Sequence, residues 1–106
     1  MKDESVTLRS SHVTLNAALV QRVFDSINYA YVTYVAEQKK ILITPVSSQW
    51  FVKIYKPTQF LLKSRNLKGD RTLAIREILI DHDLDTADRV LKFEIVEKTN
   101  LIKIAM

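Results

Sequence analysis

The sequence predicts a mostly β domain with short helices, arranged as a pseudo-symmetric pair of strand–helix–hairpin units. Residues 13–44 run through a short β-like segment, an apolar-periodic stretch, an Asp and two β-like runs joined by a charged turn, and residues 71–104 follow the same order. The matching positions are Thr14-Leu15 with Thr72-Leu73, Asp25 with Asp83, and residues 35–42 with 95–102. Because so small a unit cannot bury its own apolar face, we expect two copies to share one core. A generic α+β domain is the alternative.

The first unit is expected to begin with a polar lead-in or edge strand at residues 1–10, followed by a short strand at residues 12–15. Asn16 is suited to cap a helix, since its side-chain oxygen can accept a free N–H of the first turn. The apolar residues of this helix recur at spacings of three and four, at Leu19, Val20, Val23, Phe24 and Ile27.

Residues 29–35 and 41–44 are aromatic and β-branched, which predicts a hairpin around a turn at residues 37–40. Residues 50–55 alternate in a way that predicts a further strand. Residues 59–63 are expected to form one or two helical turns.

Residues 64–69 form a basic segment that is expected to link the units, and residues 71–73 begin the second one. Residues 75–81 fit helical spacing, but part of this stretch fits a strand equally well, so both remain open. Residues 89–97 alternate strongly, and residues 101–106 are expected to close the second hairpin.

The 106 residues predict one domain spanning residues 1–106, with pseudo-repeats at about 9–46 and 65–106. No apolar run approaches the length of a membrane span, and the charged N-terminus lacks the apolar region of a signal peptide. There is no cysteine, which excludes a disulfide framework and a thiolate zinc site. We therefore expect a cytoplasmic protein without a membrane partner.

The net charge of +4 is unevenly distributed along the chain. No acidic residue lies between Glu37 and Asp70, whereas seven lysines and arginines do. This asymmetry is typical of a face that binds a polyanion, most commonly nucleic acid, although the charges could also mix again on the folded surface. Aromatic residues interleave with the same stretch and could stack bases or fill the core.

Catalytic and metal-binding patterns are weak. The single glycine, Gly69, excludes phosphate-cradling glycine-rich loops. The acidic residues at 81–88 are spaced like the start of a calcium loop, but Thr86 replaces its turn glycine and Lys92 its terminal Glu, so a charged loop is the better interpretation. His12 and His82 lack the partners of a catalytic arrangement. We expect neither an enzyme nor a cofactor.

A short strand, a helix of one or two turns and a hairpin together resemble the swapped-hairpin unit of the AbrB/SpoVT family of bacterial DNA-binding regulators. Two units in one chain resemble the MraZ arrangement of that superfamily. Ser11-His12 stands where the family has Gly-Arg, and Asn16 where it has Pro; the second unit keeps Gly69 but has Arg71 displaced by one position. The resemblance implies interleaved hairpins in a closed barrel, and binding to DNA.

The combined prediction is a small DNA-binding protein or transcriptional regulator whose lysines and arginines contact phosphates. A protein-interaction or assembly module without nucleic acid is the alternative. A homo-oligomer, most simply a dimer, is expected because an unpaired strand at residues 50–55 would have apolar residues on both faces. The candidate nucleic-acid-binding residues are Arg9, Arg22, Lys39, Lys40, Lys53, Lys56, Lys63, Arg65, Lys68 and Arg71.

Overall fold

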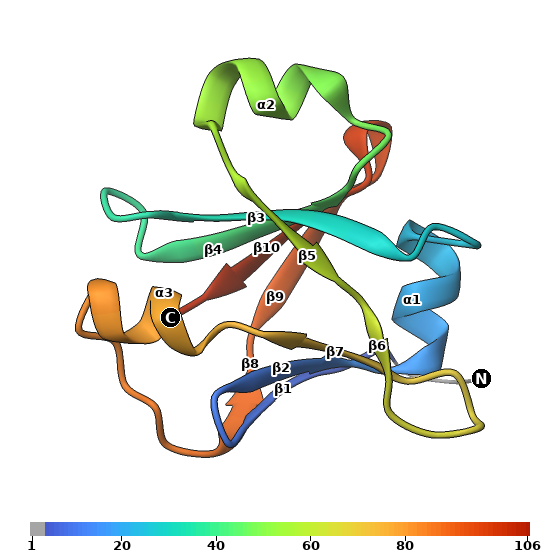
Figure 1. Ribbon diagram of the computed structural model, residues 1–106, viewed down its shortest axis with the longest axis horizontal. Helices are drawn as coiled ribbons and strands as arrows, with labels where there is room; N and C mark the ends of the chain where they lie inside the picture. The colour runs from blue at the N-terminus through green and yellow to red at the C-terminus, as the bar shows by residue number, and fades with distance from the viewer. Residues whose placement is uncertain (1–3) are drawn as a thin grey trace.

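Two antiparallel sheets of five strands each, together with three short helices, make up the computed structural model, which describes residues 4–106 (Figure 1). The strands are β1 (Val6–Arg9), β2 (His12–Leu15), β3 (Tyr29–Val35), β4 (Lys40–Pro45), β5 (Thr58–Leu61), β6 (Lys63–Ser64), β7 (Arg71–Ala74), β8 (Arg89–Leu91), β9 (Phe93–Val96) and β10 (Leu101–Ala105). The helices are α1 (Ala17–Val23), α2 (Gln49–Tyr55) and α3 (Arg76–Asp81), with a 3-10 turn at Glu97–Thr99. The prediction of a mostly β fold with short helices is confirmed.

The strand order is β6-β7-β2-β1-β8 in the first sheet and β5-β3-β4-β10-β9 in the second. The chain crosses between the sheets at both edges, because Leu62 alone separates β5 from β6 and Lys92 alone separates β8 from β9. The continuous strand predicted at residues 89–97 is therefore divided between the two sheets.

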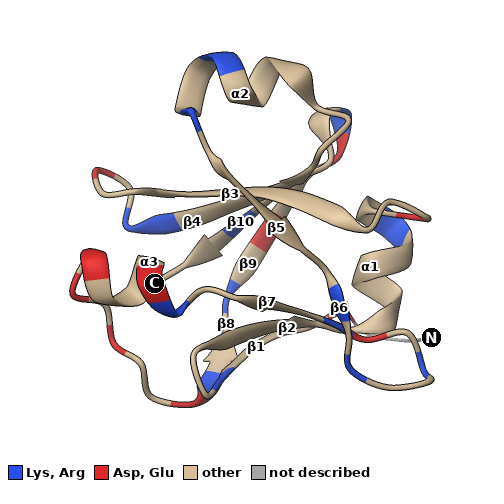
Figure 2. Cartoon of the chain, in the orientation of Figure 1, with Lys and Arg blue, Asp and Glu red and all other residues tan. Residues whose placement is uncertain are grey.

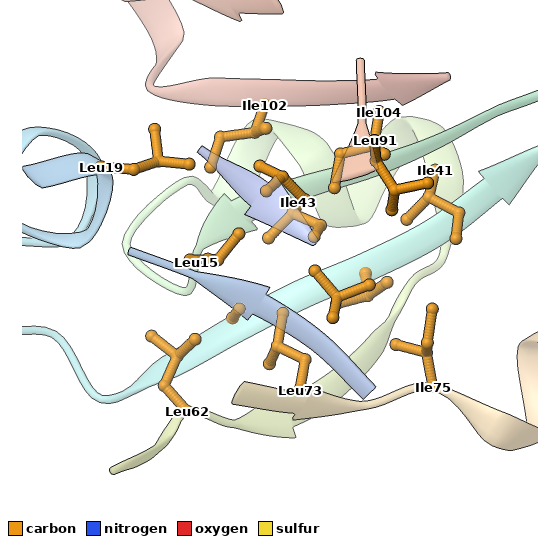
Figure 3. Close-up of a cluster of buried hydrophobic side chains, with 14 of the residues drawn as sticks. Leu15, Leu19, Ile41, Ile43, Leu62, Leu73, Ile75, Leu91, Ile102 and Ile104 are labelled. Atoms are coloured by element: carbon orange, nitrogen blue, oxygen red, sulfur yellow. The ribbon is translucent and has the colours of Figure 1, made fainter. Parts of the chain in front are cut away.

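The main core lies between the sheets, where leucines and isoleucines from both point toward one another (Figure 3). Val13 pairs with Leu73 across β2 and β7, and both side chains are fully buried. Leu19 of α1, Phe24 just after α1, and Leu79 of α3 also belong to this core. Strand alternation sends every second residue inward, as the sequence pattern predicted.

Local signals for the first helix are confirmed. The Oδ1 atom of Asn16 accepts a hydrogen bond from the backbone N–H of Leu19 at 3.1 Å, which is the expected N-cap. Helix α1 ends at Val23, however, and Asp25 has a positive φ of 52°, so Ile27 lies beyond the helix. In the second half, the open choice at residues 75–81 is decided by α3, which is a helix.

A second apolar cluster lies on the outer face of the second sheet, which α2 covers (Figure 1). Phe51 of α2 is fully buried against Leu42 and Leu101. Strand β4 is consequently buried on both faces, because Ile41 and Ile43 point into the main core while Leu42 points toward α2.

The prediction of a strand at residues 50–55 is wrong, since this segment is α2. Its side chains are apolar at nearly every position, so the pattern fits a strand and a helix equally well. In the helix, Phe51 packs against the second sheet. The expected helical turns at residues 59–63 are also wrong, because residues 58–61 pair with the free edge of β3 as β5. The expected homo-oligomer thereby loses the unpaired strand on which it was based.

The expectation for residues 1–10 is partly outside the described residues, which begin at Glu4. Within the described part, β1 is an interior strand that pairs with β2 on one side and β8 on the other. It is therefore not an edge strand.

Replacing Phe51 by Ala should lower the free energy of unfolding by about 3–5 kcal/mol, because it empties the centre of the α2 contact. The change is measured as the shift in urea midpoint at constant slope. Ile54→Ala is the matched control on the same helix, since Ile54 is 64% exposed. Equal effects of the two substitutions would contradict the packing of α2 on the sheet.

Candidate nucleic-acid interface

The outer face of the first sheet is mostly polar, with the exposed Val90 of β8 opposite Thr7 as an apolar exception. Because Leu73, Val13 and Leu8 point inward, their strand neighbours point outward. Cross-strand pairing aligns four of these outward residues in a row over β6, β7, β2 and β1: Lys63, Thr72, Thr14 and Thr7. The row places three threonines next to a lysine; Thr7 and Thr14 are partly exposed, whereas Thr72 is only 9% exposed.

A hollow of about 520 Å³ lies over this face. Its lining consists of Arg9, Ser10, His12, Thr14, Lys63, Ser64, Arg65 and Thr72. The lining contains three cations, several hydroxyls and no carboxylate. An adjoining hollow of about 190 Å³ shares Arg9, Thr14 and Arg65 with it and adds Asp70.

Among the described residues, no carboxylate forms a salt bridge with the three cations of the hollow. Within residues 4–106, the salt bridges are those of Arg22 with Glu4 and Glu97, Lys40 with Glu94, and Arg89 with Asp85. None of them involves Arg9, Lys63 or Arg65. The positive charge of these three side chains is therefore available to an anion.

Arg22 is a contrasting case. Desolvation acts against its charged form, but hydrogen bonds and charge attraction from Glu4 and Glu97 outweigh that effect and raise the pKa of the guanidinium above its ordinary value. The Glu4 carboxylate lies 2.6 Å from the guanidinium. Arg22 is therefore already paired with two carboxylates, unlike the cations of the hollow.

The loop between β6 and β7, residues 65–70, holds Arg65 at the edge of the hollow. The backbone N–H of Arg65 donates to the carbonyl oxygen of Asp70 at 2.9 Å, and the side chain of Asn66 donates to Asp70 Oδ2 at 3.0 Å. The other oxygen of Asp70, Oδ1, accepts from the backbone N–H of Ala17 at 2.8 Å. The loop is thereby attached to the start of α1.

Gly69 is required at this attachment for two reasons. Its φ of 102° lies in the left-handed region that favours glycine, and an added Cβ would lie 3.3 Å from the Cβ of Ala17.

Of the ten predicted site residues, Arg9, Lys63 and Arg65 come together at the hollow, and Lys68 lies on the adjoining loop. Arg71 points elsewhere, because its guanidinium donates to Asn28 Oδ1 and the carbonyl of Leu62. The remaining five are dispersed, as Figure 2 shows: Arg22 on α1, Lys39 and Lys40 at the β3–β4 hairpin, and Lys53 and Lys56 on and after α2.

The hydroxyl residues of the face are not among the ten site residues predicted from the sequence. Thr14 and Thr72 were used only to mark the repeat, although their polar positions within β-like runs are the signal that they face outward. His12 also lines the hollow, where its Nδ1 lies 2.9 Å from the carbonyl oxygen of Ser10.

Aromatic side chains do not share this face. Tyr31, Trp50, Phe51 and Tyr55 gather in the α2 cluster on the other sheet, and none of them lines the two hollows. The cations and aromatics that interleave in sequence are thus separated in space, which favours the core role of the aromatics over base stacking.

His82 and two aspartates of the acidic segment, which the sequence offered as weak catalytic or metal-binding candidates, contact other parts of the protein. The ring of His82 packs against Tyr34 with centroids 4.6 Å apart. In the acidic segment, Asp85 accepts from the backbone N–H of Ala87 and Asp88 from that of Ser10, each at 2.9 Å. The part of the chain that the structure describes contains no group of three His, Asp or Glu side chains suited to a metal ion.

Comparison of the chain with known protein families, curated proteins and solved structures finds no match. From Glu4 to Met106, none of the helices has the length and apolar character needed to span a bilayer.

Replacing Asp70 by Ala should lower the free energy of unfolding by about 1–3 kcal/mol, since it leaves the N–H of Ala17 without its charged acceptor. Amide hydrogen exchange should accelerate at Ala17 and in residues 65–70. Asp81→Ala, at an exposed carboxylate on α3, is the control and should change neither measurement. Unchanged exchange in the Asp70 variant would mean that this carboxylate does not hold the loop.

Proposed function

We propose that this protein is a small cytoplasmic DNA-binding protein or transcriptional regulator that contacts phosphates through the outer face of the β6-β7-β2-β1-β8 sheet. One observation carries the proposal: Arg9, Lys63 and Arg65, free of ion pairs with the other described residues, surround a hollow lined with hydroxyls and no carboxylate. Cations in this arrangement attract polyanions, and nucleic acid is the commonest polyanion in a cell.

The residue types fit contacts to the sugar–phosphate backbone. An arginine guanidinium can donate two parallel hydrogen bonds to a phosphate, and a lysine supplies a compact charge. Serine and threonine hydroxyls commonly donate to phosphate oxygens as well. Contacts of this kind position a protein on DNA without reading its sequence, so binding tolerant of sequence is expected.

We also propose that the two halves are pseudo-symmetric units of a small closed barrel, in line with the swapped-hairpin resemblance. A strand, a helix and a hairpin follow one another in each half: β2, α1, β3 and β4 in the first, and β7, α3, β9 and β10 in the second, where β8 is an additional strand. Thr14 pairs with Thr72 at the junction. Asp25 and Asp83 each lie just after a helix, and each has a φ of 52°. Each hairpin turn has a residue with a positive φ, Lys39 in the first half and Asn100 in the second. When these two residues are aligned, Val35 corresponds to Val96, whereas the sequence pattern alone pairs Val35 with Ile95.

A protein-interaction or assembly module is the second candidate, and the outer side of α2 favours it. Ile54 is largely exposed there, beside the partly exposed Trp50 and Tyr55. Such a surface suits another protein or a second copy of the chain. Failure of every duplex to bind at low salt would favour this candidate.

Neutralising the three cations of the hollow, as Arg9→Gln, Lys63→Gln and Arg65→Gln together, should abolish measurable binding to a duplex at moderate salt. Each single substitution that removes a true phosphate contact should flatten the slope of log affinity against log salt by about one unit. Fluorescence anisotropy with a labelled duplex measures both quantities.

The matched control is Lys39→Gln, Lys53→Gln and Lys56→Gln together, which removes the same charge from the other side of the molecule. This variant should retain most of the affinity. Equal losses in the two triple variants would mean that net charge, and not the hollow, governs binding.

Duplex DNA should bind more tightly than a single strand of the same length at equal salt. Unspecific single-strand sites stack bases on aromatic side chains, and the hollow has none in its lining. Competition of unlabelled single strand against a labelled duplex is the measurement. A single strand that competes better than the duplex would contradict the backbone-contact interpretation of this face.

A further inference from the structure

Leu67, at the tip of the β6–β7 loop, is the most exposed large apolar side chain among the described residues. It has 107% of its reference area exposed, whereas Val90, the next most exposed, has 76%. In Figure 1 the loop projects from the end of the first sheet, away from the body of the molecule. A single exposed leucine is common on protein surfaces. Leu67 is distinguished by its place between two cations, Arg65 and Lys68, at the tip of a hydrogen-bonded loop.

The loop holds Leu67 outward by fixing the residues on both sides of it. Asn66 Oδ1 accepts from the backbone N–H of Lys68 at 2.9 Å, and the side chain of Asn66 also donates to Asp70. The hydroxyl of Ser64 donates to the carbonyl of Asn66 at 3.3 Å. Such preorganisation reduces the entropy lost when the loop binds a partner.

The charges around Leu67 indicate the kind of partner. Arg65, two positions before it, lines both hollows of the basic face, and Lys68 follows it directly. Figure 2 shows these cations on the loop beside that face. A ligand that complements an apolar tip between two cations has an anionic surface and an apolar interior. Duplex DNA has both, because its stacked bases lie between two sugar–phosphate strands.

We infer that Leu67 is a wedge that enters a DNA groove and partly separates two base pairs while the hollow holds the adjacent phosphates. This inference rests on the proposed function and adds the class of DNA that binds best. Apolar wedges flanked by basic residues kink a duplex by unstacking one step. The preferred ligand is therefore a duplex whose steps unstack at low cost, such as one with pyrimidine–purine steps or a mismatch.

The test uses two labelled duplexes of equal length, one fully paired and one with a central mismatch, and three proteins: wild type, Leu67→Ser and Leu67→Met. The wild type should prefer the mismatched duplex by roughly tenfold, because a mismatched step unstacks at a lower free-energy cost than a paired one. It should also shorten the end-to-end distance measured by energy transfer between dyes at the duplex ends.

Leu67→Ser should abolish both the preference and the bend while keeping the salt dependence, because the phosphate contacts remain. Leu67→Met should restore both. Ile54→Ser is the control for an exposed isoleucine elsewhere, and it should behave as the wild type. Because Leu67 is fully exposed, Leu67→Ser should also keep the wild-type urea midpoint.

The outcomes separate the two proposals. Binding to both duplexes by Leu67→Ser with an unchanged preference and bend overturns the wedge and leaves DNA binding intact. Absence of binding by the wild type to either duplex at low salt overturns the proposed function and the wedge with it.

Discussion

The pairing of β2 with β7 determines both the core and the polar face. This ladder joins the two halves of the chain, and its register sets Val13 opposite Leu73 and Thr14 opposite Thr72. Since side chains alternate along a strand, the first pair points into the core and the second points outward. A slip of β7 by one residue would reverse Thr72 and Leu73, burying a hydroxyl and exposing an apolar group. The packing free energy of the core therefore also fixes the hydroxyl row.

The remaining surfaces are largely covered as a consequence of how the chain closes the two sheets. At each edge one residue, Leu62 or Lys92, carries the chain from one sheet to the other, so β5 and β9 continue into strands of the first sheet. Helix α2 then covers the outer face of the second sheet around Phe51. The outer face of the first sheet is the broad sheet surface left to solvent. Its mostly polar composition is what a solvated sheet face requires. Among the described residues, Arg9, Lys63 and Arg65 form no salt bridge, and this is what suggests binding.

Much of the fold was predictable where the signal is local. The helical spacing and the Asn16 cap located α1, and β-branched runs located β3 and β4, because these patterns depend on near neighbours in sequence. Residues 50–55 were assigned wrongly because their apolar composition fits strand and helix alike, and contacts with Leu42 and Leu101 select the helix. The site was predictable only in part. Arg9 lies near Lys63 and Arg65 because strands distant in sequence pair with one another. Arg22 instead forms an ion pair with Glu97, 75 positions away.

Asp70 explains how a basic face can persist beside an acidic residue. Within the described chain, it is the one carboxylate that lines the two hollows sharing Arg65. Its oxygens already accept hydrogen bonds from the N–H of Ala17 and the amide of Asn66, and it forms no salt bridge with Arg65. The same carboxylate thus holds the loop without pairing with the charge that the loop presents. A ligand that binds the loop and the hollow together also favours the attached start of α1, so binding should stabilise the native fold as a whole.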